Sequence, residues 1–375
     1  MKIEQHVRTA GGWVAGGARG ATTHPQLALV FASPTALRDP ATWSDLATRY
    51  AGARVVGCST AGEIAGTNVT DDTVVVTAIE LEHGHVAIAA VRLDTAPDSH
   101  ALGAQLAAQL PAAGLVHVLV ISEGLRINGS ALVGGLVSVL PAGVSVTGGL
   151  SGDGARFEGT TVCVDGPTPT DQIVAIGFYG ERLHISYGSR GGWDRFGPER
   201  TITSSTGNVL RELDGEPALD LYKRYLGEHA AELPASGLLF PLEIWTDGGE
   251  PVVRTILAVD EKERTLTFAG DLPTGYRARL MKANFERLID GASSAATASL
   301  DGGASPDLAI LISCVGRKLV LKQRIEEEVE AVREIFGDAT VMTGFYSYGE
   351  VSPFSHAARC ELHNQTMTVT TISER

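Results

Sequence analysis

The stretch Gly57-Cys58-Ser59-Thr60-Ala61-Gly62-Glu63 is a glycine-flanked polar turn that directly follows the strand-like run Arg54-Val55-Val56. Two further stretches resemble it, Gly148-Gly149-Leu150-Ser151-Gly152-Asp153 and Gly344-Phe345-Tyr346-Ser347-Tyr348-Gly349-Glu350, and each also follows a short strand-like run. A unit that recurs along a chain indicates a repeated architecture. We therefore expect three turns at the carboxyl ends of three strands, with at least two of them sharing one pocket.

The residues that precede each turn also follow one order: an apolar strand, a polar loop, a helix and a short strand. The three apolar runs are Leu27–Phe31, Val116–Ile121 and Leu308–Ile312. They lack polar alternation, which is typical of strands buried on both faces of a parallel sheet. Helices are predicted for residues 42–50, 130–140 and 319–336.

Further β-rich segments surround these units. Residues 73–81 and 86–93 are predicted to form a hairpin around Glu82-His83-Gly84-His85. The glycine-rich, charged passage 188–200 is the best candidate for a domain boundary. We predict an α/β fold of two mixed domains with internally repeated strand-helix-strand units and added β-hairpins. The predicted ranges are a lead-in (1–26), an N-terminal domain (27–200) and a C-terminal domain (201–375).

Composition limits the classes of partner. The 375 residues carry a formal net charge of −14 and contain no basic run, which disfavours nucleic acid, since phosphate binding needs concentrated Lys and Arg. The four cysteines are widely spread and form no Cys-x-x-Cys pair, which fits a reducing cytoplasm. Neither a signal peptide nor a membrane span is predicted. We expect a cytoplasmic protein whose partners are small molecules or proteins.

As an ordered set, the three turns resemble the FIST family, which pairs an N-terminal with a C-terminal FIST domain. Two further stretches carry the resemblance, Gly270-Asp271-Leu272-Pro273-Thr274-Gly275 and Leu362-His363-Asn364-Gln365-Thr366. The resemblance implies a sensory module of bacterial signalling that binds a small ligand, with amino acids among the candidates. It supplies no shared catalytic residue. No output domain is recognised in the sequence, so a separate signalling protein is the expected partner.

Each turn offers hydroxyls, backbone N–H groups and one carboxylate, a combination suited to a zwitterion in a strand-end crevice. Arg126 adds a bidentate donor for a ligand carboxylate, and the aromatic third turn adds pocket walls. Alternatively, the glycines satisfy backbone geometry, the carboxylates cap neighbouring segments, Arg126 is solvated and the aromatic residues are core or interface. The predicted ligand-binding residues are Cys58, Ser59, Thr60, Glu63, Arg126, Asn128, Gly149, Ser151, Asp153, Tyr346, Ser347, Tyr348 and Glu350.

The sequence gives weaker support to an enzymatic function than to ligand binding. Cys58 lies on a turn whose N–H groups would lower the pKa of a thiol, but no recurring turn contains a histidine base. Ser151 fails the Gly-x-Ser-x-Gly pattern at Asp153. No catalytic residue, metal or cofactor is predicted. The sequence favours a small-ligand-binding sensory protein; the alternatives are a thiol-dependent acyl-transfer or hydrolytic enzyme using Cys58, and a protein-interaction scaffold.

Overall fold

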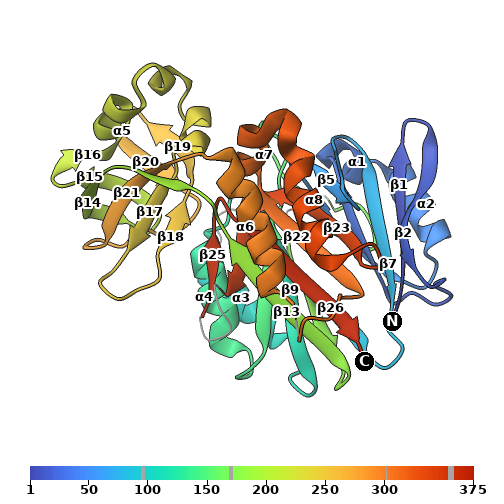
Figure 1. The fold of residues 1–375 in the computed structure, drawn as a ribbon. Coiled ribbons are helices and arrows are strands. Elements are labelled where there is room, and N and C mark those ends of the chain that lie inside the picture. The colour runs from blue at the N-terminus through green and yellow to red at the C-terminus, as the bar shows by residue number, and fades with distance from the viewer. Residues whose placement is uncertain (94–97, 169–171, 301, 354–358) are drawn as a thin grey trace.

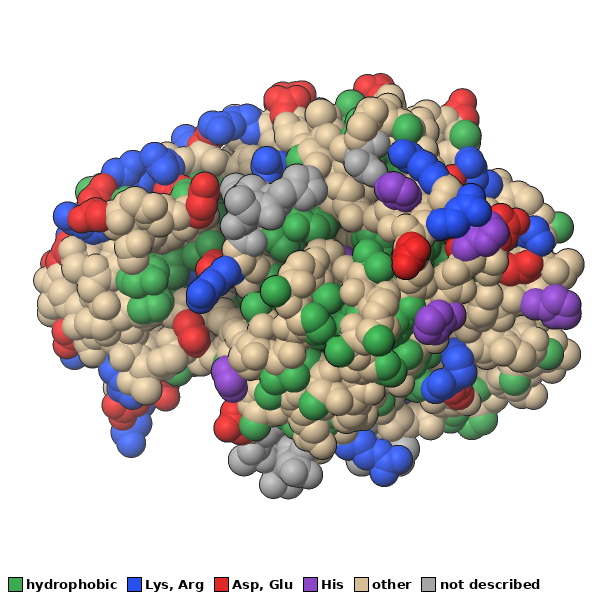
Figure 2. Space-filling model, turned by 90° about the horizontal axis from the view of Figure 1, so that it is seen from below, with side chains coloured by type: hydrophobic (Ala, Val, Ile, Leu, Met, Phe, Trp, Pro, Cys, Tyr) green, Lys and Arg blue, Asp and Glu red, His purple; other side chains and the backbone are tan. Residues whose placement is uncertain are grey.

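A computed structural model of the chain describes residues 1–93, 98–168, 172–300, 302–353 and 359–375. Figure 1 shows a larger body, which holds three six-stranded sheets, and a smaller lobe on its left. In Figure 2, seen from below, hydrophobic side chains gather on the body, and charged side chains of both signs are scattered around them. Among the described residues, no helix is both long and apolar enough to cross a membrane.

Each six-stranded sheet is built around one parallel pair of strands. The three pairs are β3 (Leu27–Ala32) with β4 (Arg54–Ser59), β9 (Leu115–Ser122) with β10 (Ser145–Leu150), and β22 (Leu308–Cys314) with β23 (Val341–Ser347). All residues of β3 and β22 are buried, as their continuous apolar runs predict. The strands of a pair are connected by helices: α1 (Pro34–Arg38) and α2 (Pro40–Arg49); α4 (Gly129–Val139); α7 (Val315–Leu321), η3 (Lys322–Arg324) and α8 (Ile325–Phe336).

The strands beside each pair also repeat. The first strand of each pair has an antiparallel neighbour, which pairs in turn with an outer strand. The neighbours are β7 (Val74–Glu80), β12 (Gln172–Tyr179) and β26 (Met367–Glu374); the outer strands are β1 (Lys2–Thr9), β8 (His85–Arg92) and β13 (Leu183–Arg190). Strand β2 (Gly12–Arg19) extends the first sheet, and helix α3 (Ser99–Ala108) packs on α4. The body therefore contains three units of one design, which confirms the predicted repetition.

The strand that follows each turn leaves its own unit. After the first turn, β5 (Glu63–Ala65) pairs with β23 of the third sheet. After the second, β11 (Val162–Val164) pairs with β4 of the first sheet, and after the third, β24 (Gly349–Pro353) pairs with β10 of the second. Strands β6 (Asn68–Thr70) and β25 (Cys360–His363) extend β5 and β24. Each sheet thus receives an edge from another unit, in a closed cycle.

The hairpin predicted around residues 82–85 is wrong. Strand β7 lies between β3 and β1 in the first sheet, whereas β8 pairs with β12 in the second. Both edges of β7 are occupied and all of its residues are buried, so it has no edge to offer β8. Residues 81–84 instead connect the first unit to the second. The carboxylate of Glu374 holds this connection by accepting hydrogen bonds from the backbone N–H groups of Glu82, His83 and Gly84 at 2.7, 2.6 and 2.7 Å.

The lobe is inserted into the third unit, between β13 and helix α6 (Phe285–Ala298). Its apolar core lies between helix α5 (Ala218–Leu226) and an eight-stranded sheet. Its elements are β14 (Asp194–Thr206), β15 (Val209–Leu213), β16 (Glu216–Pro217), α5 (Ala218–Leu226), η1 (Gly227–Glu232), η2 (Ala235–Leu239), β17 (Leu242–Trp245), β18 (Val252–Arg254), β19 (Ile256–Asp260), β20 (Thr265–Phe268) and β21 (Arg277–Lys282).

The fold class, α/β with mixed sheets in two domains, is confirmed. The domain limits stay a prediction. The limit at residue 200 falls inside β14, and the lead-in of residues 1–26 supplies β1 and β2 to the first sheet.

Candidate functional site

The three glycine-flanked turns meet where the three sheets join. Tyr346 of the third turn exchanges two backbone hydrogen bonds with the first turn. The N–H of Ala61 donates to the carbonyl oxygen of Tyr346, and the N–H of Tyr346 donates to the carbonyl oxygen of Gly62, both at 2.8 Å. The second turn donates from Gly152 N–H to Ser59 O at 2.9 Å. The third turn donates to the second, from Tyr348 N–H to Leu150 O at 3.0 Å. The ends of the three parallel pairs are therefore joined to one another by backbone hydrogen bonds.

Two glycines of the turns are required by close backbone packing. A Cβ atom on Gly148 would lie 1.9 Å from the carbonyl oxygen of Val120 on the parallel partner strand. A Cβ atom on Gly344 would lie 1.8 Å from the carbonyl oxygen of Leu311, in the corresponding place in the third unit. No side chain fits at such distances. At these two positions, backbone geometry is sufficient to explain the glycine.

The carboxyls of Glu63 and Glu350 occupy equivalent positions and make equivalent contacts. Glu63 accepts hydrogen bonds from Thr60 Oγ1 at 2.5 Å and from the backbone N–H and hydroxyl of Thr73 at 3.1 and 2.9 Å. Glu350 accepts from Ser347 Oγ at 2.6 Å and from the N–H and hydroxyl of Thr366 at 3.2 and 3.0 Å. Burial raises the pKa of Glu63 to about 7 and that of Glu350 to about 8. Each carboxyl thus ties its turn to the next segment of chain.

Asp153, the carboxylate of the second turn, organises the loop that follows it. It accepts hydrogen bonds from the backbone N–H groups of Phe157, Glu158 and Gly159, each at 2.9 Å, and from the hydroxyl of Tyr348. Burial alone would raise the pKa of Asp153, but these hydrogen bonds outweigh it and hold the pKa below its ordinary value. Asp153 is therefore ionised at neutral pH.

A crevice of about 360 Å³ opens beside the first turn. It lies next to the carboxyl ends of β3 and β22, the edge at which open α/β sheets bind ligands. All three units contribute to its walls, which consist of Ser33, Thr60, Ala61, Glu63, Asp71, Asp72, Gly154, Ala155, Arg156, Val315, Lys318 and Leu319. An adjoining cavity of about 320 Å³ shares Ser33, Asp72 and Arg156 and adds Arg38, Asp153 and Glu158.

Charges of both signs line this crevice. Lys318 Nζ donates to the carbonyl oxygen of Ala61 at 2.9 Å and forms an ion pair with Asp71. The side chain of Asp71 is 67% exposed, so solvent screens this pair. Arg156 is exposed at the same crevice, and Glu63 lies in its wall. A ligand that carries both a carboxylate and an ammonium would find partners for each.

Of the predicted ligand-binding residues, Thr60 and Glu63 line the crevice and Asp153 lines the adjoining cavity. Arg126 is exposed on the loop before α4, and Asn128 caps α4 and donates to Asp271 Oδ1 of the lobe at 2.6 Å; neither lines the crevice. The others are buried and line neither cavity: Cys58, Ser59, Gly149, Ser151, Tyr346, Ser347, Tyr348 and Glu350. Their role in ligand binding stays a prediction.

The geometry gives no support to the two alternatives. Cys58 has no exposed surface, and burial raises the pKa of its thiol well above the ordinary value. The thiol is therefore protonated at neutral pH and out of reach of a substrate. Phe345, Tyr346 and Tyr348 are at most 2% exposed, so the aromatic third turn belongs to the core and offers no docking surface.

Sequence reasoning missed the charged residues outside the turns, Lys318, Arg156 and Asp71. A signal for Lys318 was present, because it follows the carboxyl end of β22, the kind of position that had drawn attention to Arg126 in the second unit. The predicted helix at residues 319–336 begins too late. Helix α7 begins at Val315 and carries Lys318 in its second turn.

Comparisons with known proteins give one clear result. The sequence profile of the FIST N domain matches residues 26–216, and that of the FIST C domain matches residues 218–353. No protein of curated function matches the chain. A crystal structure of cyanuric acid hydrolase from A. caulinodans aligns over 94% of this chain and 90% of that one, at 10% identity and a TM-score of 0.31. A TM-score of this size carries no functional argument.

Proposed function

Because the chain belongs to the FIST family, we propose that it is a cytoplasmic sensor that binds an amino acid or another small carboxylate in the crevice beside its first turn. FIST domains are generally sensory, small-ligand-binding domains of signal transduction. A separate signalling protein would receive the signal. The observation that carries the proposal is the placement of opposite charges around one crevice at the carboxyl ends of parallel strands.

The crevice suits a small zwitterion. Lys318 and Arg156 are the donors for the ligand carboxylate, and Asp71 and Asp72 are the acceptors for its ammonium. Glu63 is a further acceptor in the wall, although Thr60 and Thr73 already donate to its two oxygens. A volume of about 360 Å³ holds a ligand of amino-acid size.

The test is a ligand screen followed by two variants. A panel of amino acids and small carboxylates is added to the full chain, and a ligand of the folded state raises the melting temperature with increasing concentration. Calorimetry then compares the wild-type protein with Lys318→Gln and Glu63→Gln. We expect Lys318→Gln to weaken binding by roughly 10-fold or more, because a charge-assisted hydrogen bond is lost.

A matched control is Lys223→Gln, which removes a lysine of the lobe that pairs with the exposed Glu261. It is expected to leave affinity unchanged. If no compound in the panel shifts the melting temperature, or if a compound that binds does so equally well to Lys318→Gln and Glu63→Gln, the crevice is not the sensory site.

A further inference from the structure

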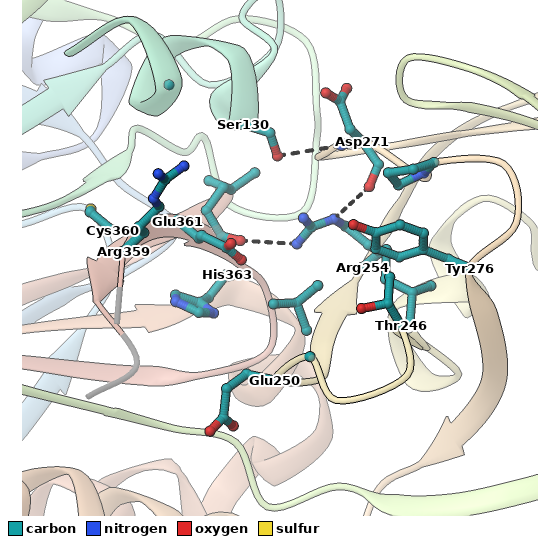
Figure 3. A pocket seen from close by; sticks show the side chains of 16 residues that line it. Ser130, Thr246, Glu250, Arg254, Asp271, Tyr276, Arg359, Cys360, Glu361 and His363 are labelled. Atoms are coloured by element: carbon teal, nitrogen blue, oxygen red, sulfur yellow. Dashed lines mark hydrogen bonds between the residues drawn. The ribbon is translucent and has the colours of Figure 1, made fainter. Parts of the chain in front are cut away.

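A separate cavity, of about 550 Å³, lies where the lobe meets the body. Strands β17 and β18 and residues 271–276 form its lobe side, and α4 and β25 form its body side. Figure 3 shows this cavity. Among the residues that the structure describes, none lines both this cavity and the crevice beside the first turn.

Arg254 of β18 is a buried cation in this wall. Its side chain is held by backbone carbonyls: Nε donates to Asp271 O at 3.0 Å, and Nη1 donates to Leu362 O at 2.9 Å and to Val253 O at 3.3 Å. Arg254 is 5% exposed. Within the described ranges, Nη2 has no hydrogen-bond partner and no carboxylate lies within 4 Å of the guanidinium.

Burial of this cation is incompletely compensated. Burial lowers the pKa of Arg254 to about 10, and the charges of Glu361 and Asp271 oppose that effect only in part. The guanidinium therefore remains charged at neutral pH. A buried charge that no carboxylate contacts directly is costly, and an anion that enters the cavity would relieve that cost.

Other groups in the wall define what kind of anion fits. Tyr276 lies beside Arg254 in Figure 3, and its hydroxyl donates to no residue that the structure describes. Thr246 offers a second hydroxyl. Much of the remaining wall is apolar, from Ile244, Val252 and Leu362.

We propose that this cavity binds a small monocarboxylic acid with an apolar body, its carboxylate held by Arg254 Nη2 and the Tyr276 hydroxyl. A guanidinium matches the planar geometry of a carboxylate, and an apolar pocket with a few fixed polar groups is the usual form of a small-molecule site. The acidic side chains of Glu250, Glu361 and Asp271 outnumber the two cations of the same wall, Arg254 and Arg359, which disfavours a dianion such as phosphate. The bound acid would contact both the lobe and the body.

Benzoate is the probe, and isothermal titration calorimetry on the full chain is the assay. We expect saturable binding of benzoate, none of its neutral analogue benzyl alcohol, and no competition by inorganic phosphate. Arg254→Lys keeps the positive charge but loses the planar guanidinium that can donate two parallel hydrogen bonds to a carboxylate, so benzoate should bind roughly 10-fold more weakly or worse. Tyr276→Phe leaves the contacts of Arg254 intact and should weaken binding roughly 3- to 10-fold.

The controls separate this site from the crevice. Arg277→Lys alters an exposed arginine of β21 that pairs with Glu199, and it should bind benzoate like the wild-type protein. Lys318→Gln tests the crevice as the alternative site, because loss of benzoate binding in this variant would place benzoate in the crevice. The proposal is overturned if benzoate does not bind, if Tyr276→Phe and Arg254→Lys both bind it at wild-type affinity, if Lys318→Gln abolishes binding, or if phosphate displaces benzoate.

Discussion

The buried ion pair of Arg317 and Glu328 gives the sharpest test of how the third unit is held together. Neither side chain has exposed surface. Arg317 donates from Nε and Nη2 to Glu328 Oε2 at 2.9 and 2.7 Å, and from Nη1 and Nη2 to the carbonyls of Gly191 and Leu288 at 2.8 and 2.7 Å. Arg317→Met removes all four hydrogen bonds while keeping an apolar stem.

The expected cost follows from what is left behind. Removing one partner of a buried ion pair costs about 3–5 kcal/mol, because the other charge remains buried. Each of the two freed carbonyls adds about 1 kcal/mol or more if no other donor reaches it. Glu328 keeps hydrogen bonds from Ser313 Oγ at 3.0 Å and the Tyr346 hydroxyl at 2.6 Å, which moderates the loss. We expect Arg317→Met to lower the free energy of unfolding by about 4 kcal/mol.

A double-mutant cycle tests the reasoning by equilibrium urea unfolding. Arg317→Met combined with Glu328→Gln removes the unpaired charge, so the double variant should be more stable than Arg317→Met by about 2 kcal/mol. Arg324→Met is the control, since Arg324 is 40% exposed and its pair with Glu327 should be worth less than about 1 kcal/mol. A loss below about 1 kcal/mol for Arg317→Met, or simple additivity in the cycle, would refute the account.

Two further predictions concern the turns. Burial raises the pKa of Glu350 from its ordinary value to about 8, so between that ordinary value and pH 8 the folded state keeps a proton on Glu350 that the unfolded state has lost. The contribution of protonated Glu350 to the stability of the folded state is therefore full at low pH and is lost as pH rises through 8. Urea unfolding between about pH 5 and 8 should therefore show a shallower fall in stability for Glu350→Gln than for wild type, while the exposed control Glu330→Gln keeps the wild-type slope; equal slopes would contradict the burial argument. Gly344→Ala should cost at least about 3 kcal/mol, because its Cβ would meet the carbonyl oxygen of Leu311 at 1.8 Å. Gly166→Ala, where a Cβ meets no atom of the described residues within 4 Å, should change the melting temperature little, and a similar shift for both variants would show that the strands separate easily.

The parts of the fold that depend on local sequence were predictable. Buried parallel strands such as β3 and β22 are continuous apolar runs, and the glycines of the turns marked where strands end. The exchange of β5, β11 and β24 between sheets was not predictable, since strand pairing over long sequence separations leaves no periodic signal in either strand. The hairpin prediction failed for that reason: local spacing favoured it, and distant partners had already taken the edges of β7.

The candidate sites were only partly predictable for a different reason. The turns identified the region, but residue type does not reveal whether a carboxyl such as Glu350 faces a ligand or a neighbouring threonine. Lys318 lines the crevice, and Arg254 lines the cavity between lobe and body, only through the packing of separate units. The position of Lys318 after β22 was its only local signal, and Arg254 had none. The surroundings of Lys318 and Arg254 in the fold, rather than their neighbours in the sequence, make them candidates.

The cyclic exchange of edge strands has a consequence for how the protein folds. Strand β5, which begins at Glu63, can pair only after β23, which contains Phe345, has formed far along the chain. Strands β11 and β24 likewise depend on strands of another unit for their pairing. Pairing over such separations is slow, because loop-closure entropy is lost before the contacts compensate for it. We expect the three units to reach native stability in one late cooperative step. Until then, the open edges of β4, β10 and β23 could pair with another nascent chain, which makes this stage the one most exposed to aggregation.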